Sequence, residues 1–535
     1  MEQRNIILAF GLSMLILLGW GSLFPPAEQP IVQEQITAEQ QEAIEQAPAR
    51  SELGPDESSM NSIDPPAPVE KRVDTVTDTV FSGETISFSN DLLELQVNEK
   101  GWLVAAKLAK YKESKEKDAG SVSVLGKQDM HSVHVSAGIM REKGSSLFKL
   151  VSKERVNGAD VLKIRASLAD GRIWERTMTL IPGSYLVELE DSVQNGAGLK
   201  LFRQVVERYP NRDGSTFYEY AGPVGLVNDV LQEPGYDDLD ESGTVRVAGV
   251  GGWTGVMDRY FITALYGDQS QDYRYYYIGD GRSYQAGMID DGVMDGATAV
   301  FKSNVYIGPK LISELEREGA QLERSVDYGW FAFIAKPLHE ALSWFYKYVP
   351  NYGWCIILLL IGIKIIFFYP TQKSYQSMAA MRKIQPEQKR LQERFGDDKQ
   401  KLGQEMMGLY KKHKVNPLGG CLPIIIQIPV FFALYKVLLM SIEMRHAPFI
   451  GWIQDLSAQD PYFILPLLMG ASMYIQQKLN PQPPDPMQAK IMSFLPVVFT
   501  VMFLFFPSGL VLYWVVNNVL SIAQQRLVMR KMGVD

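Results

Sequence analysis

Apolar residues form long runs near both ends of the chain and alternate with polar residues in between. The first run, residues 6–24, holds nineteen residues without a charge. As a helix it covers about 28 Å, which suits a bilayer core. Further runs cover residues 352–369, 418–440, 461–477 and 491–526. The last is too long for one helix, and a turn at 506–509 divides it, so the pattern predicts a polytopic α-helical membrane protein with six spans.

The first run has a second interpretation, a cleaved signal peptide. Its nineteen residues are long for the apolar region of a signal peptide, and no small-x-small cleavage site precedes Pro25. We therefore expect an uncleaved transmembrane anchor over residues 1–24.

Basic residues in the short loops predict the orientation of the spans. Residues 372–416 carry eleven Lys and Arg against five Asp and Glu, whereas residues 441–460 carry a single basic residue, Arg445. Because Lys and Arg favour the cytoplasmic side, residues 372–416 and both termini are expected in the cytoplasm. Residues 25–335 are then expected across the membrane, in the periplasm of a cell with two membranes.

In the exported part the apolar pattern changes to the period of two that marks β-strands. Leu162, Ile164 and Ala166 alternate with polar residues, and Asp170-Gly171 then supplies a turn before the next alternation. Such a pair of runs is typical of a β-hairpin.

The same device recurs along this part of the chain. Asp280-Gly281 follows a strand-like run of tyrosines. Many short strands without helices between them predict a β-sandwich over residues 81–330. Residues 25–80 are rich in Pro, Glu, Gln and Ser, and we expect a disordered linker there.

Charge separates the chain into two unlike parts. Residues 25–335 hold 31 Lys and Arg against 49 Asp and Glu, and the remaining residues hold 22 against 12. The acidic excess argues against a chain that binds DNA as a whole. The two cysteines, Cys355 and Cys421, exclude a disulfide framework and a cysteine-rich metal site.

Two clusters in the exported part resemble ligand-binding motifs but lack the required residue spacing. One glycine cluster lacks the spacing of a phosphate-binding loop and is interpreted as a β turn: Gly249, Gly251, Gly252 and Gly255. One acidic cluster lacks EF-hand spacing and is interpreted as a solvated loop: Asp237, Asp238, Asp240 and Glu241. No hydrolase, metalloprotease or nucleotide motif occurs, so we expect no catalysis, no cofactor and no metal.

Residues 372–416 predict a cytoplasmic hairpin of two amphipathic helices joined at Gly396. Its apolar positions include four methionines: Met378, Met381, Met406 and Met407. Two interpretations stay open at about even weight. Either the apolar faces simply pack, as Met at helical spacing most often does, or the methionines receive varied apolar segments of other proteins.

Polar residues inside the predicted spans are costly and require an explanation. Lys364 and Gln427 each lie in the cytoplasmic half of a span. A third set recurs every four residues in the last span, as one stripe: Tyr513, Asn517, Ser521 and Gln525. Together they predict a hydrophilic groove open to the cytoplasm, although hydrogen bonds that merely join helices explain Gln427 and Asn517 equally well.

Three stretches of the chain closely resemble the YidC membrane protein insertases of Gram-negative bacteria, in the YidC/Oxa/Alb family. They read RFGDDKQKLGQEMMGLYKKHKVNPLGGCLPIIIQIPVFFALYKVL, WIQDLSAQDPYFILPLLMG and FPSGLVLYWVVNN. The resemblance is strong over residues 330–530 and extends in layout to the anchor and the exported domain.

The resemblance implies a five-span conserved core with a cytoplasm-open hydrophilic groove, and an exported domain like a β-supersandwich. It implies a non-catalytic insertase and chaperone of the inner membrane that acts alone or with the Sec translocon. The implied partners are nascent single- and two-span membrane proteins, membrane lipid and, weakly, the ribosome. The implied groove residues are Lys364, Gln427 and Tyr513, to which the stripe adds Asn517 and Ser521.

The sequence departs from the family pattern in the groove. The family's usual groove cation is Arg, and Lys364 keeps the charge without the planar fork that binds a carboxylate at two points. The tail after Arg526 is short, which weakens the expectation of ribosome binding.

The sequence fits two other functions less well. A solute transporter would carry polar residues into the outer half of the spans and an internal repeat, and neither is evident. A membrane-anchored carbohydrate enzyme would need one span and not six. The expected order is an anchor, a linker, a β-sandwich, an interfacial helix with the second span, the hairpin, four further spans and a short tail: 1–24, 25–80, 81–330, 331–371, 372–416, 417–527 and 528–535.

Overall fold

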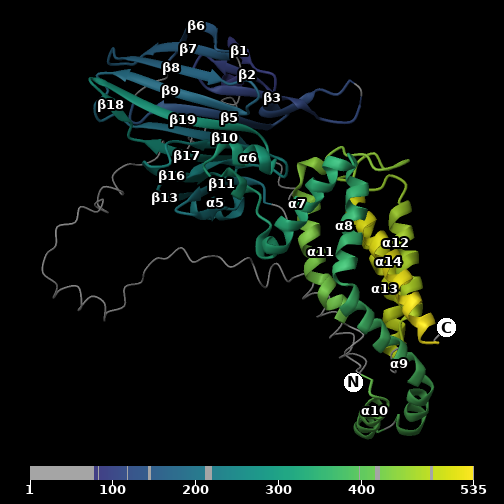
Figure 1. Cartoon of the computed structure of the whole chain (residues 1–535). Helices are drawn as coiled ribbons and strands as arrows, with labels where there is room; N and C mark the ends of the chain where they lie inside the picture. The colour runs from purple at the N-terminus through teal and green to yellow at the C-terminus, as the bar shows by residue number, and fades with distance from the viewer. Residues whose placement is uncertain are drawn as a thin grey trace, which may run out of the picture. The chain divides into compact units, whose positions relative to one another are not determined.

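The computed structural model describes residues 78–81, 83–116, 118–142, 146–210, 220–396, 398–415, 422–481 and 486–533. The predicted anchor, residues 6–24, and the linker up to residue 77 lie outside the described residues. The described chain divides into two compact units: apart from two short segments, the first ends at Ser325 and the second begins at Val326. Figure 1 shows strands in the first unit and helices in the second.

Two antiparallel sheets build the first unit. The nine-stranded sheet has the order β1 (Thr85–Ser89), β2 (Leu93–Asn98), β3 (Leu103–Lys112), β4 (Ser121–Gln128), β5 (His131–Ile139), β10 (Leu201–Arg208), β17 (Ser283–Asp290), β16 (Asp272–Gly279) and β13 (Thr244–Val250). The ten-stranded sheet has the order β12 (Val230–Gln232), β11 (Gly222–Val227), β14 (Trp253–Met257), β15 (Phe261–Tyr266), β19 (Thr298–Pro309), β9 (Leu186–Gln194), β8 (Ile173–Leu180), β7 (Ala159–Ser167) and β6 (Lys149–Val156), with β18 (Val293–Asp295) beside β19. The predicted β-sandwich is confirmed.

The alternation that predicted the strands is the burial pattern of β7. Leu162, Ile164 and Ala166 are buried, whereas the residues between them are exposed. Strands β7 and β8 pair as the predicted hairpin, with Gly171 at a φ of 85° in the turn. Glycine tolerates this left-handed conformation because it has no Cβ.

The glycine cluster and the acidic cluster of the first unit differ in their local structure. Gly251 and Gly252, with φ of 59° and 88°, turn the chain between β13 and β14, as expected. The acidic cluster was expected to be a loop, and this expectation is wrong. It lies on a short helix, α5 (Tyr236–Ser242), whose first turn carries Asp237 and Asp238. Acidic side chains in the first turn stabilise a helix because they lie at the positive end of the helix dipole.

A buried charge network joins the two sheets. Asp191 on β9 accepts hydrogen bonds from Arg176 Nε at 2.7 Å and from Trp174 Nε1 at 2.6 Å, both on β8. Its other oxygen accepts from Arg203 Nη2 on β10 of the opposite sheet, at 2.5 Å. Arg203 Nη1 also donates to Ser303 on β19 at 2.6 Å. Buried charges are tolerated when they are paired in this way.

His134 on β5 makes the stability of this unit depend on pH. Burial, followed by the charges of Arg208 and Lys100, lowers the pKa of His134 from 6.5 to about 3. The unfolded chain therefore binds one more proton than the folded chain between these two values, and stability falls as the pH falls below about 6.5.

We expect the free energy of unfolding to fall by up to about 1.4 kcal/mol per pH unit through this histidine. Urea unfolding of the wild type and of His134→Phe at pH 7, 6 and 5 measures the effect. The variant is expected to show a shallower pH dependence, and an unchanged slope would contradict the assignment.

Helices make up most of the second unit. They are η3 (Gly329–Phe331), α7 (Ala332–Tyr348), α8 (Tyr352–Ile366), α9 (Phe368–Phe395), α10 (Lys399–His413), α11 (Leu422–Met440), η5 (Ile442–Met444), α12 (Ile464–Leu479), α13 (Pro486–Phe503) and α14 (Ser508–Lys531). The first unit also holds α4 (Asp78–Phe81), α6 (Ile312–Glu318) and η2 (Leu322–Ser325). The long last run is two helices, α13 and α14, as predicted.

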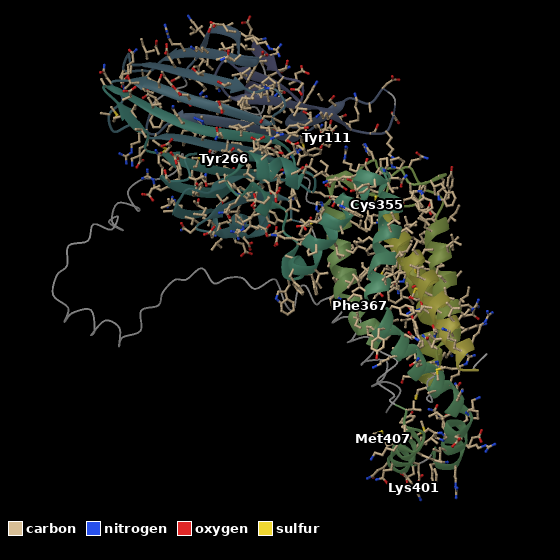
Figure 2. The ribbon with its side chains drawn as sticks, viewed as in Figure 1. Tyr111, Tyr266, Cys355, Phe367, Lys401 and Met407 are labelled. Atoms are coloured by element: carbon tan, nitrogen blue, oxygen red, sulfur yellow. The ribbon has the colours of Figure 1, made fainter. Side chains whose placement is uncertain are left out.

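The predicted second span bends sharply near its end. Helices α8 and α9 meet at Phe367 with an angle of 71° between them (Figure 2). Pro370 explains the break. A proline has no N–H to donate a hydrogen bond to the carbonyl of Ile366, four residues earlier, and the proline ring would clash with that carbonyl. In the first turn of α9 the same proline is tolerated. The hairpin therefore begins inside the expected span.

Helix lengths bear on the predicted spans. Among the residues that the structure describes, no single helix is both long and apolar enough to cross a bilayer, and one bent pair, α8 with α9, meets both criteria together. The six spans stay a prediction.

The hairpin has the predicted form of two helices. Asp398 caps α10 by accepting a hydrogen bond from the backbone N–H of Lys401 at 3.0 Å. Glu387 on α9 faces His413 and Lys412 at the end of α10, at 3.3 Å and 3.9 Å. Pro386 lies within helix α9, which is continuous through it.

Candidate functional site

Helix α14 is the element that carries most of the predicted site. It packs against α8, α9, α11 and α12, and Figure 1 shows it in yellow within the helical unit. Polar side chains on different faces of α14 therefore meet different neighbours.

Lys364 on α8 reaches the predicted stripe of α14. Its ammonium donates a hydrogen bond to Ser521 Oγ at 2.8 Å. Ser521 is buried and Lys364 is half-buried. Among the described residues this amine forms no ion pair, so the cation has a hydroxyl partner there and keeps donors for a further acceptor.

Gln427 on α11 meets the same helix nearer its start. Its Nε2 donates to the hydroxyl of Tyr513 at 2.6 Å, and the Tyr513 side chain is only 1% exposed. The structure thus brings four of the five predicted groove residues together in two pairs, Lys364 with Ser521 and Gln427 with Tyr513.

Asn517 lies between these two pairs on α14. Tyr513 and Ser521 are eight residues apart, about 12 Å along a helix, and Asn517 is midway. Its side chain is 9% exposed, and its Oδ1 atom is buried without a hydrogen-bond partner in the described part of the chain. A buried amide oxygen without a partner lowers stability, which calls for another reason for its presence.

Gln525, the fourth member of the predicted stripe, faces a different neighbour. It donates to Asn480 Oδ1 at 3.0 Å and to the carbonyl of Leu479 at 3.3 Å, both at the end of α12. Asn518 likewise donates to Ser472 on α12, at 2.9 Å. These contacts join α12 to α14, and the single stripe is wrong at its last member.

Aromatic rings, which the sequence interpretation missed, surround the pair of Gln427 and Tyr513. Trp514 lies next to Tyr513 and packs on Phe431 and Phe503, with ring centroids 4.8 Å and 5.1 Å away. Phe503 also packs on Phe506 at 5.0 Å. The polar ladder from Ser521 to Tyr513 therefore ends against aromatic side chains. The sequence signal for this aromatic cluster is the spacing of aromatic residues by four, as in Phe431 and Tyr435, because residues four apart lie on the same side of a helix.

The four predicted methionines of the hairpin have different surroundings. Met378 is buried beside Tyr375 and Val528, with Met532 packed on them, so it belongs to the contact between α9 and α14. Met406 is buried and Met381 is half-buried. Met407 on α10 is 55% exposed, and its place is marked in Figure 2.

Within the described ranges, no three His, Cys, Asp or Glu side chains come close enough to hold a metal ion.

Comparison with known proteins identifies relatives over the whole length. A solved structure described as an active YidC insertase with its first transmembrane domain resolved is 16% identical, with a TM-score of 0.36, and the match covers 83% of this chain and 92% of that one. A membrane protein insertase YidC of Magnetococcus marinus is 46% identical over 431 residues, 77% of each chain. One of Nitrosococcus oceani is 38% identical over 564 residues, 99% of each chain.

Two family models divide the chain between them. Residues 85–341 match the YidC periplasmic domain, and residues 344–534 match the 60Kd inner membrane protein. The relatives at 46% and 38% identity cover more than two thirds of the chain. The chain therefore belongs to the YidC family of membrane protein insertases, inner-membrane proteins with a periplasmic domain.

Proposed function

We propose that this insertase moves its clients along a hydrophilic groove that is open to the cytoplasm and to lipid. Its lining comprises Lys364, Gln427, Tyr513, Asn517 and Ser521. The observation that carries the proposal is the polar ladder of α14, in which two hydrogen-bonded pairs flank an amide oxygen without a partner.

The physical advantage of such a groove is a shorter dry path. A polar segment of a new membrane protein loses its hydrogen bonds to water in hydrocarbon, at a cost of several kcal/mol for each unsatisfied group. A row of donors and acceptors over about 12 Å replaces part of that water. The aromatic rings beside Tyr513 then mark the limit of the hydrated part. The step needs no covalent chemistry and no catalytic residue.

Lys364 supplies the positive charge of the groove. Its amine makes one hydrogen bond to a neutral hydroxyl, so an acidic or carbonyl oxygen of a passing segment finds free donors there. The apolar part of the client then leaves sideways into lipid, where it gains its hydrophobic transfer energy.

The remaining expectations complete the proposal. Both termini and the hairpin lie in the cytoplasm, and six spans include the anchor at 1–24. Clients are small membrane proteins with one or two spans, received first at the exposed Met407. The Sec translocon is a partner for larger clients, lipid surrounds the helices, and the short tail makes the ribosome a minor partner.

Site-specific cross-linking tests the groove directly. A photo-reactive residue in place of Gln427 or Tyr513 is expected to trap a nascent single-span protein on a stalled ribosome. The matched control is Val519 on α14, which is 53% exposed and lies about 240° around the helix from Tyr513. Equal cross-linking at Val519 and at the two groove positions would remove the groove from the account.

A further inference from the structure

Five buried polar atoms without a hydrogen-bond partner gather on three neighbouring strands of the periplasmic unit. They belong to strands β5, β10 and β17, within the part of the chain that the structure describes: Ser132 Oγ, His134 Nδ1, Arg208 Nε, Ser283 Oγ and Gln285 Oε1. Buried polar groups are paired in most proteins, so a group of five in one place requires a reason.

Strand register places these residues on one face of the nine-stranded sheet. Arg208 is opposite Ser132 on one side and Ser283 on the other, which forms one row. Two residues further along, Val206 is opposite His134 and Gln285, which forms the next row. Residues directly opposite each other, and residues two apart on a strand, share a face.

This face points away from the other sheet. Arg203 on β10 bonds to Ser303 and Asp191 of the ten-stranded sheet, so the odd-numbered residues of β10 face the interior. Val206 and Arg208 have the opposite parity and lie on the other face of the sheet, where Val206 is buried and Arg208 is half-exposed. Aromatic contacts hold His134 in the second row, the row of His134, Val206 and Gln285. The Trp102 ring stacks on His134 with centroids 5.6 Å apart, and the Phe81 ring packs edge-on against His134 at 5.8 Å.

The size of the two rows limits what they hold. Adjacent strands are about 4.8 Å apart and residues two apart on a strand are about 6.8 Å apart. The five atoms therefore cover an area of roughly 10 Å by 7 Å, which matches a six-membered ring with its substituents.

The chemistry of the atoms points to a neutral ligand with both donors and acceptors. Gln285 Oε1 only accepts, Arg208 Nε only donates, and the two serine hydroxyls do both. His134 is a neutral imidazole at ordinary pH because its pKa is lowered to about 3. Burial lowers the pKa of Arg208, while the nearby charge of Asp280 opposes this and offsets the positive charge of Arg208.

From this juxtaposition we infer that the outer face of β5, β10 and β17 is a binding site for a small, neutral, polyhydroxylated molecule of monosaccharide size. Each hydroxyl of such a molecule both donates and accepts, so it can satisfy the donors and the acceptors of the two rows. The outer row is the entrance: Ser283 begins β17 directly after the exposed turn at Asp280-Gly281, and Arg208 is half-exposed. The inference is independent of the groove in the helical unit.

Ligand binding and thermal unfolding of the full chain in detergent micelles test the site together. The probes are D-glucose, D-galactose and glycerol, detected by saturation transfer from protein to ligand protons. We expect saturable binding of at least one probe. Ser283→Ala and Gln285→Leu each remove one hydrogen bond to the bound probe. This loss is expected to weaken binding of the probe about five- to tenfold.

Gln204→Leu is the matched control on the same sheet face. Its side chain has a partner, since Gln204 Oε1 accepts from the Tyr276 hydroxyl at 2.8 Å. This variant is expected to bind the probe as the wild type does and to unfold at a lower temperature. Ser283→Ala and Gln285→Leu lose no hydrogen bond within the protein. Without ligand, their unfolding temperature is therefore expected to be no lower than that of the wild type.

Two results would overturn the inference. One is the absence of binding for all three probes. The other is unfolding of Ser283→Ala and Gln285→Leu below the wild type with unchanged probe affinity, which would assign these atoms to structural water alone.

Discussion

Lys364→Ala is expected to lower insertion of a small single-span client at least tenfold in cells depleted of their own insertase, whereas Lys364→Arg keeps most of the activity. The amine is the only one of the five proposed groove side chains with a charge, and Ser521 holds it from α14. Alanine removes both the charge and the hydrogen bond. Arginine keeps a cation and adds donors in a planar fork. Protease protection of the labelled client measures insertion.

Lys436→Ala is the matched control for the loss of a cation. Lys436 is also half-buried, on α11 near the predicted outer end, away from the proposed groove. It is expected to insert the client at the wild-type rate. Full activity of Lys364→Ala at normal expression would show that the charge is dispensable and would contradict the proposed role.

Asp191→Ala is expected to cause the largest loss of stability in the periplasmic unit, about 3–5 kcal/mol. Asp191 is fully buried and pairs with both Arg176 and Arg203. Without it, two buried guanidinium groups face each other unpaired, and Trp174 loses its acceptor. Urea unfolding of the full chain, followed by tryptophan fluorescence, measures the change.

Glu190→Ala is the control, one residue away on the same strand. Glu190 pairs with Lys302 at 3.3 Å, but both side chains are more than half exposed. Exposed pairs contribute little, so this change is expected to alter stability by less than about 1 kcal/mol. An effect of Asp191→Ala as small as that of Glu190→Ala would show that the network does not hold the sheets together.

Local pattern was sufficient for much of the fold. The alternation of Leu162, Ile164 and Ala166 predicted a strand because burial on one face of a sheet follows a period of two. The turn residues Asp170-Gly171 predicted the hairpin. Apolar runs, and the polar residues inside them, predicted the membrane unit and its groove, and the resemblance to a known family added the insertase function.

The stripe on α14 failed at Gln525 for a geometric reason. Residues four apart on a helix are rotated by about 40°, so three steps from Tyr513 turn the side chain by about 120°. Gln525 consequently faces α12 instead of α8 and α11. A repeat of four along a helix indicates one face only over about two turns.

The buried charge network was missed although its signal is present in the sequence. Arg176, Asp191 and Arg203 each occupy the core phase of a strand, as Arg176 does between Trp174 and Met178. A charged residue at such a position is buried and needs a partner, but the pairing joins strands of two sheets and depends on tertiary structure. The bend at Phe367 was missed because the apolar run was interpreted as one span up to residue 369, with the hairpin beginning only at residue 372.

The most direct measurement of the central claim is the access of water to position 364. A Lys364→Cys variant, with Cys355 and Cys421 both replaced by alanine, is treated with a membrane-impermeant maleimide in inside-out and right-side-out vesicles. Met407→Cys, on an exposed helix position, is the positive control, and Leu360→Cys, at a position 1% exposed on α8, is the negative control. The account predicts labelling at position 364 from the cytoplasmic side alone, and labelling as low as at position 360 from that side would contradict it.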